Sequence, residues 1–454
     1  MSIIQPRTLK GFRDYLPVTM TAREHVIDTA REVYRRFGFT PIDTPALEYS
    51  EILFGKGSDE TDRQMYRFED NGGRDVAMRF DLTVPLARFI AQHVGVIGTP
   101  FKRYAVGPVW RGENTQRGRF REFVQFDFDT IGTESLVADV ETIVVVHDLF
   151  DRLDISPFTI HFNNREILNG LLDRLGLREQ AGSVLRAVDK LAKIGADGVR
   201  SELEEHSGAT TAQADEILAL ARLEGSNDEI LRALPAVVGT SEAATRGTAV
   251  LGTVLDGIRA SGVAETRISI DVSIARGLAY YTGTVFETFL DDLPGIGSVC
   301  SGGRYDDLAS LYTKQRLPGI GGSLGVDRLI AAMEELGRVD ERAASADVFV
   351  ALFAEDRTDD YLRLVGELRR DGLSVELYPD AKKLGAQMKY ADRRGHRLAV
   401  IIGDKEWDAG TAKVKILDTG ESIETPLANL AGECRRLVSG PVVRSGGANL
   451  PRDG

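Results

Sequence analysis

Charged and aromatic side chains gather in one stretch of the sequence, residues 103–132, which reads RYAVGPVWRGENTQRGRFREFVQFDFDTIG. Two β-rich runs flank an arginine-rich loop, and this pattern predicts a β-hairpin with a charged tip. Guanidinium groups bind phosphate oxygens through paired hydrogen bonds, and an aromatic ring offers a flat face to a purine. Carboxylates further along can hold an ammonium or imidazole group. The stretch therefore has the chemistry to bind a polyanion together with an amine.

The return strand of this hairpin presents two different faces, because side chains along a strand alternate. Phe126 and Phe128 share one face with Glu122 and Val124, and this face can be the packed side. Such a strand can leave its other face solvated, or that face can form the floor of a binding site. The chemistry of the loop favours the binding site. The residues of that second face are Arg121, Phe123, Gln125, Asp127 and Asp129.

A second polar group lies upstream, in VAMRFDLTVPLARFIAQH at residues 76–93. Asp81, Leu82 and Thr83 separate a short strand from a predicted helix, and Pro85 suits the first turn of that helix. Because Asp and Thr commonly cap helices, capping and substrate binding both remain open for these side chains.

Three downstream segments also carry residue types that suit a binding site. Residues 267–290 alternate like a strand and contain the hexapeptide RGLAYY. CSGGRYDDL, residues 300–308, predicts a tight glycine-rich turn. PGIGGSLGVDRL, residues 318–329, places glycines in a loop before a helix, although it has neither the P-loop nor the dinucleotide-binding spacing.

These segments together resemble the histidyl-tRNA synthetase family of class II aminoacyl-tRNA synthetases. WRGENTQRGRFREFVQFDFD resembles the second class motif, and the glycine-rich segment PGIGGSLGVDRL resembles the third. The apolar spacing from Ala22 to Phe37 predicts an amphipathic helix that ends near Gly38. KGFRDYLP and the unit from this helix to Pro45 resemble the opening segment and the first motif. RGLAYY and CSGGRYDDL resemble the two histidine-specific signatures, although the usual form of the first is RGLDYY and Ala279 departs from it. The resemblance runs from about Lys10 to Leu437.

The resemblance implies a histidine–tRNA ligase. Such an enzyme activates L-histidine with ATP to give histidyl-adenylate and pyrophosphate, and then transfers histidine to the 3′ end of tRNA(His). ATP is the expected substrate, and Mg²⁺ is expected with it, but the sequence does not show its ligands or a protein metal site. The first motif implies a homodimer. Two alternatives stay open: a noncatalytic sensor of histidine or uncharged tRNA, which Ala279 keeps in view, and a class II synthetase for another amino acid.

The resemblance also implies roles for individual residues. The expected catalytic residues beside the α-phosphate are Arg111 and Arg276. The expected histidine-binding residues are Asp81, Leu82, Thr83, Arg111, Gln125, Asp129, Arg276, Tyr280 and Tyr281. The expected ATP-binding residues are Arg111, Glu113, Arg119, Phe123 and Arg328. Within the histidine set, Asp129 and the Tyr281 hydroxyl are expected to satisfy the two imidazole nitrogens.

Length predicts several domains, since 454 residues exceed what a single core usually holds. The expected fold class is α/β (α+β): an antiparallel-sheet catalytic domain of the class II synthetase type with a helical insertion, and a C-terminal α/β anticodon-binding domain. VDKLAKIGADGVRSEL in the insertion resembles the eukaryote-like branch of the family. The expected bounds are 1–337 for the catalytic core, about 178–262 for the insertion, 338–346 for a linker, 347–437 for the anticodon-binding domain and 438–454 for a disordered tail.

Composition limits the other possibilities. The net charge of −13 argues against a nonspecific nucleic-acid coat but leaves room for a local basic face. KKLGAQMKYADRRGHR, residues 382–397, has six Lys or Arg residues and one acidic residue, which fits a tRNA contact or a solubilising helix face. Two distant cysteines predict neither a disulfide framework nor a zinc site. We expect a cytoplasmic protein, because the sequence has no signal-like or membrane-spanning apolar run.

Overall fold

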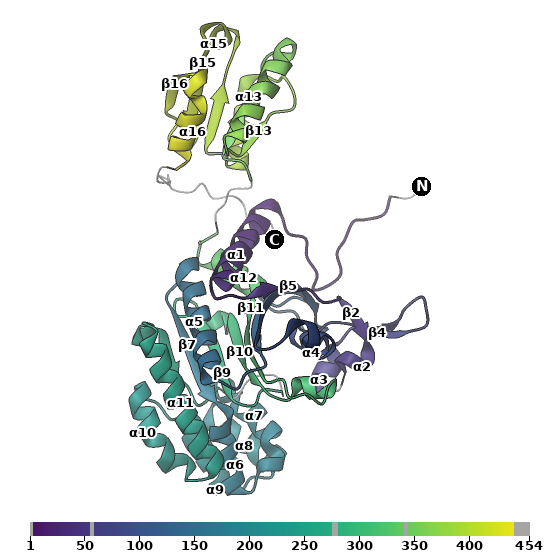
Figure 1. Cartoon of the computed structure of the whole chain (residues 1–454), viewed down its shortest axis with the longest axis vertical. Helices are drawn as coiled ribbons and strands as arrows, with labels where there is room; N and C mark the ends of the chain where they lie inside the picture. The colour runs from purple at the N-terminus through teal and green to yellow at the C-terminus, as the bar shows by residue number, and fades with distance from the viewer. Residues whose placement is uncertain (1–2, 55–58, 275–279, 340–343, 440–454) are drawn as a thin grey trace. The chain divides into compact units, whose positions relative to one another are not determined.

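A computed structural model describes residues 3–54, 59–274, 280–339 and 344–439 (Figure 1). The chain divides into two compact units. The larger unit holds most of the chain up to Arg338, and the smaller unit holds the chain from Val339 onward together with a short piece near the N-terminus.

An eight-stranded sheet forms the centre of the larger unit. Its strands are β1 (Thr40–Pro41), β5 (Phe101–Trp110), β6 (Glu122–Ile131), β7 (Phe158–Asn164), β8 (Ile268–Ile270), β9 (Thr284–Leu290), β10 (Cys300–Tyr305) and β11 (Gly319–Gly325). They lie in the order β1-β5-β6-β11-β10-β9-β7-β8. Only the two edge pairs, β1 with β5 and β7 with β8, are parallel. The expected antiparallel sheet is therefore confirmed.

The predicted hairpin consists of β5 and β6, which pair over ten residues from Phe101 opposite Ile131 to Trp110 opposite Glu122. Phe126 and Phe128 are buried against Tyr34. Their ring centroids lie 4.9 and 4.8 Å, respectively, from the ring centroid of Tyr34. On the opposite face, Arg121 and Phe123 are half-buried and the residues that follow are buried, so the alternative of a fully solvated face is wrong. Its buried polar residues are Gln125, Asp127 and Asp129.

The two glycine-rich segments form strands β10 and β11, so the prediction of a tight turn and of a loop at these positions is wrong. The glycines are needed for close approach between strands. A Cβ on Gly302 would lie 2.1 Å from the carbonyl oxygen of Gly321, and one on Gly321 would lie 2.2 Å from Asp129 Oδ1. Glycine is therefore required here because a side chain would clash with the neighbouring strand, and not because the chain turns.

Helices and a small sheet complete the unit around the hairpin. The helix expected before Gly38 is confirmed, and its buried face includes Val26, Ala30, Val33 and Tyr34. The helices are α1 (Pro17–Arg36), α2 (Ser50–Leu53), α3 (Asp59–Gln64), α4 (Thr83–Ile97), α5 (Leu136–Leu153) and α12 (Val326–Glu335). The small sheet has the order β2-β4-β3, with β2 (Leu47–Tyr49), β3 (Arg67–Glu69) and β4 (Asp75–Met78).

A helical module separates β7 from β8 and is drawn in teal in Figure 1. Residues 165–260, which the structure describes without a gap, contain no strand. Repeated apolar spacing buries one face of each helix, as at Val184, Ile217 and Leu251. The helices are α6 (Arg165–Leu175), α7 (Ala181–Val188), α8 (Leu191–Ser207), α9 (Thr211–Ala221), α10 (Asn227–Val238) and α11 (Glu242–Ala260).

The smaller unit is a five-stranded mixed sheet with helices. Its strands are β12 (Val348–Val350), β13 (Val375–Leu377), β14 (Leu398–Ile401), β15 (Thr411–Ile416) and β16 (Ser422–Pro426), in the order β13-β12-β14-β15-β16. Its helices are α13 (Thr358–Arg370), α14 (Leu384–Arg394), α15 (Asp404–Ala409) and α16 (Leu430–Val438). The strands and helices of this unit confirm the α/β fold expected for the C-terminal domain. Most of the predicted tail, from residue 440 on, lies outside the described residues.

Candidate active site

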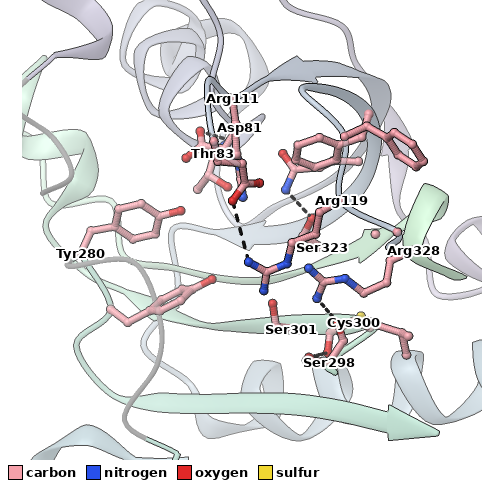
Figure 2. Close-up of a pocket in the computed structure, with 18 residues that line it drawn as sticks. Asp81, Thr83, Arg111, Arg119, Tyr280, Ser298, Cys300, Ser301, Ser323 and Arg328 are labelled. Atoms are coloured by element: carbon pink, nitrogen blue, oxygen red, sulfur yellow. Dashed lines mark hydrogen bonds and ion pairs between the residues drawn. The ribbon is translucent and has the colours of Figure 1, made fainter. Parts of the chain in front are cut away.

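A cavity of about 210 Å³ opens between the charged hairpin, the start of α4, and strands β10 and β11 (Figure 2). Figure 2 shows Tyr280 at one end and Arg328 at the other, with Arg119 between them. Tyr280 lies near the carboxylate of Asp81 and the hydroxyl of Thr83, and the guanidinium groups of Arg119 and Arg328 line the part of the cavity beyond them. The cavity therefore offers two chemically different halves within one space.

Asp81 and Thr83 line the first half from the start of α4. Asp81 is 5% exposed, and its Oδ1 accepts hydrogen bonds from the backbone N–H groups of Thr83 at 3.1 Å and Val84 at 2.9 Å. Burial raises the pKa of Asp81. The side chain thus accepts hydrogen bonds from two N–H groups at the start of the helix and also faces the cavity, so capping is observed and substrate binding stays a prediction. Leu82 is buried, and it is not part of the cavity lining.

Arg111 is held rigidly in the cavity wall. Its guanidinium carbon lies 4.3 Å from the centre of the Phe80 ring and 5.0 Å from that of Phe123, and its Nε donates to the Phe80 carbonyl at 3.1 Å. Burial lowers the pKa of Arg111, yet a guanidinium stays protonated at neutral pH. Stacking on aromatic rings orients the group and leaves donors for an anion.

The cationic half of the cavity joins the hairpin loop to α12. Arg119 Nη1 lies 3.8 Å from Glu113 Oε2, so the acidic side chain partly neutralises it. Arg328 donates to the carbonyl oxygen of Ser298. Phe123 also lines this half. Each residue in the predicted ATP-binding set therefore lines the same cavity.

Gln125 and two tyrosines line the remaining wall. Gln125 Nε2 donates to Ser323 Oγ at 2.9 Å. Tyr280 and Tyr281 stack edge to face with ring centroids 5.1 Å apart. Burial raises the pKa of Tyr281, and the carboxylates of Asp129 and Asp127 add to the shift.

The hexapeptide that carries these tyrosines is only partly described. Residues 275–279 lie outside the described residues. The roles predicted for Arg276 and the departure at Ala279 therefore have no structural description.

Asp129 is not among the residues that line the cavity, and its expected contact with the imidazole stays a prediction. Its carboxylate is 3% exposed and lies on the same face of β6 as the lining residues Phe123 and Gln125. Tyr305 donates to Oδ1 at 2.6 Å, and Arg103 Nη2 approaches Oδ2 to 2.5 Å. Both oxygens are thus engaged by buried partners. Burial raises the pKa of Asp129, whereas the positive charge of Arg103 opposes that rise.

Sequence reasoning missed Arg103 and Tyr305. The hairpin register places Arg103 directly opposite Asp129, so the pairing of β5 with β6 was the signal that could have found it. Tyr305 ends the CSGGRY strand, and its role depends on a partner 176 residues away. A second carboxyl group, that of Asp127, is buried beside Asp129 on the same strand. Burial raises the pKa of Asp127 to about 7 despite the positive charge of Arg103.

The described part of the chain shows neither a cluster of metal-ligating side chains nor a membrane-spanning helix. It contains no group of three or more His, Cys, Asp or Glu side chains that could hold a metal ion. No helix among these residues is both long enough and apolar enough to span a membrane.

Comparisons with known proteins identify the family and the fold of this chain. The family model described as histidyl-tRNA synthetase matches residues 11–329, and one described as anticodon binding domain matches residues 347–437. A histidine–tRNA ligase of Rhodopirellula baltica is 60% identical over 420 residues, covering 92% of this chain and 95% of that protein. The crystal structure of a histidyl-tRNA synthetase from Nostoc sp. PCC 7120 has a TM-score of 0.87 and 36% identity, covering 96% and 100% of the two chains.

A more distant structure shares the fold alone. It comes from Bacillus halodurans and is described as an ATP phosphoribosyltransferase regulatory subunit/histidyl-tRNA synthetase, with a TM-score of 0.73 and 23% identity over 86% of this chain and 97% of the other.

The antiparallel sheet and the cavity built on its hairpin define a class II aminoacyl-tRNA synthetase catalytic fold. The chain belongs to the histidyl-tRNA synthetase family. The similar proteins are of the bacterial type, so the eukaryote-like branch suggested by the insertion has no support among them.

Proposed function

We propose that this protein is a histidine–tRNA ligase that forms histidyl-adenylate from histidine and ATP and then charges tRNA(His). One observation carries the proposal. A single cavity brings Asp81, Thr83 and Tyr280 together with the guanidinium groups of Arg119 and Arg328, and its wall holds Arg111 stacked on two aromatic rings. This arrangement suits an amino acid and a nucleotide bound next to each other.

In the first step, a carboxylate oxygen of histidine forms a bond to the α-phosphorus as the bond to pyrophosphate breaks. The protein needs to align the two reactants and neutralise the charge that develops on the α-phosphate. Arg111 supplies a fixed guanidinium for this purpose, and Arg276 is proposed as the second. Arg119 and Arg328 are proposed to bind the outer phosphates, with Phe123 under the adenine and Glu113 at its amino group.

Histidine recognition is proposed to use groups from the start of α4, from β6 and from the tyrosine pair before β9. Asp81, Thr83 and Gln125 are the proposed ligands of the α-ammonium group, and Tyr281 the proposed partner of the imidazole. Asp129 is proposed as the second partner of the imidazole, with its carboxylate held by Tyr305 and Arg103. A competing apolar side chain would leave these groups unpaired, at a cost of about 1–3 kcal/mol each.

Mg²⁺ is proposed to enter with ATP. Because no cluster of ligating side chains lies in the described part of the chain, we assign the ion no protein ligands and no step of the reaction.

The remaining proposals concern partners and organisation. The match of residues 347–437 to an anticodon-binding domain supports tRNA(His) as the partner of the smaller unit. The domain bounds expected from the sequence, a homodimer built on the first motif and a cytoplasmic location are proposed on the family resemblance.

Histidine-dependent ATP–pyrophosphate exchange tests the proposed function. The purified protein is assayed with each of the twenty amino acids, and exchange is expected with histidine alone. Arg111→Ala is expected to lower kcat/KM by a factor of about 10²–10³, the usual loss for one fixed charge-stabilising donor. Histidine binding without exchange would instead identify a noncatalytic sensor, and exchange with a different amino acid would change the assigned substrate.

A further inference from the structure

The lead-in before α1 reaches the hairpin loop that carries the cationic half of the cavity. The carbonyl oxygen of Gly11 accepts a hydrogen bond from the backbone N–H of Arg121 at 2.8 Å. Gly11 has φ +86°, and a Cβ there would lie 2.7 Å from Arg121 Cγ, so only glycine allows this approach. Two residues later, the Arg13 guanidinium lies 4.1 Å from the centre of the Phe120 ring, which lines the cavity.

The same arginine also approaches the helix that carries Arg328. Arg13 Nη2 lies 3.4 Å from Oδ1 of Asp327, a residue that is 1% exposed in the first turn of α12. The other oxygen of Asp327 accepts the backbone N–H of Val124 in β6 at 2.6 Å. Asp327 therefore ties α12 to the hairpin, and Arg13 bridges this junction to the loop.

We propose that residues 11–13 form a strap across the nucleotide half of the site and that Arg13 is a positioning residue for ATP. The proposal rests on the proposed function for the identity of the ligand. Arg13 acts through Phe120 and through Asp327, the residue before Arg328.

A loop outside regular structure needs such contacts to hold its side chains in one geometry. Glu113, Arg119 and Phe120 all lie in the hairpin loop and line the cavity. The strap joins this loop to α12, so its loss is expected to affect the nucleotide half more than the amino-acid half, which is built on α4 and the tyrosines.

The test compares Arg13→Ala with Arg7→Ala in histidine-dependent ATP–pyrophosphate exchange. Arg7 lies in the same lead-in and is exposed, so its replacement makes the same charge change away from the strap. Arg13→Ala is expected to raise the KM for ATP roughly five- to thirtyfold, the size of a lost cation–π contact with a partly buried ion pair. The KM for histidine is expected to stay within about twofold. Arg13→Lys keeps the charge and is expected to recover part of the loss.

Equal rises in both KM values, or no rise for ATP, would overturn the proposal. If Arg13→Ala unfolds at a lower temperature, the folded Arg13→Lys variant tests the proposal instead. A KM for ATP between those of the wild type and Arg13→Ala supports the strap, and a wild-type KM rejects it. If the wild-type protein catalyses no exchange, the proposed function fails by itself. The strap is then tested by calorimetric titration with ATP, where weaker binding by Arg13→Ala supports it and unchanged binding rejects it.

Discussion

At the scale of single residues, a buried carboxylate next to the cavity lining is held by two partners from other strands. Arg103 is fully buried and meets Asp129, whose second oxygen accepts the Tyr305 hydroxyl. An unpaired carboxylate at this depth would be very costly, so the arginine and the tyrosine allow a negative charge to persist close to the pocket. We expect the orientation of this carboxylate, rather than its presence alone, to determine how well histidine binds.

Replacing Tyr305 with Phe tests this expectation. Loss of one hydrogen bond to a buried carboxylate is worth about 1.5–3 kcal/mol, so the KM for histidine is expected to rise about ten- to a hundredfold. The KM for ATP should change little. Tyr312→Phe is the matched control, because its hydroxyl donates to the carbonyl of Ile52 at 2.7 Å, outside the cavity lining. Steady-state exchange kinetics separate the outcomes, and a parallel rise for ATP would contradict the assignment.

At the scale of elements, the neighbouring glycines of β10 and β11 set how closely the central strands pack. Gly302 pairs with Gly322 on one side and with Phe286 on the other. A side chain at Gly302 would enter the backbone of β11 and displace the strand below the cavity. The requirement comes from strand-to-strand contact, which local turn patterns do not reveal.

Gly302→Ala is therefore expected to lower the stability of the larger unit by about 3 kcal/mol, the upper range for overpacking a core. Gly252→Ala in α11 is the matched control, since its new Cβ would only touch Leu231 at 4.0 Å. That change removes a helix glycine and should stabilise by about 0.5–1 kcal/mol. Calorimetric Tm values for both variants check the prediction, and a wild-type Tm for Gly302→Ala would show that the strands can separate without cost.

At the scale of the whole molecule, a protein of net charge −13 still carries a basic helix in its smaller unit. Helix α14 exposes Lys389 and Arg393, which lie four residues apart and so on one face. Contacts with phosphates release counterions, so such a face can hold tRNA in a salt-dependent way despite the overall charge. The two units would then divide the work, with adenylate formation in one and tRNA binding in the other.

The double variant Lys389→Glu, Arg393→Glu tests this division. Aminoacylation is expected to show a KM for tRNA at least about tenfold higher and a salt dependence reduced by one to two phosphate contacts. Exchange without tRNA should be unchanged. Arg363→Glu with Arg370→Glu on α13 makes the same charge change at two other exposed positions. Equal loss in both double variants would point to overall charge rather than to α14.

The sequence by itself determined the elements and most of the cavity wall. Alternation in β6 and helical spacing in α1 are local patterns, so they predicted the hairpin and the helix before Gly38, and the motifs that resemble the family implied lining residues such as Arg111 and Arg328. Tertiary structure alone decided which of these groups face the cavity. Asp129 is on the predicted face of its strand but is buried outside the cavity lining, where Arg103 and Tyr305 from two other strands engage both of its oxygens. Such pairing depends on sheet order and register, which no single segment of the sequence specifies.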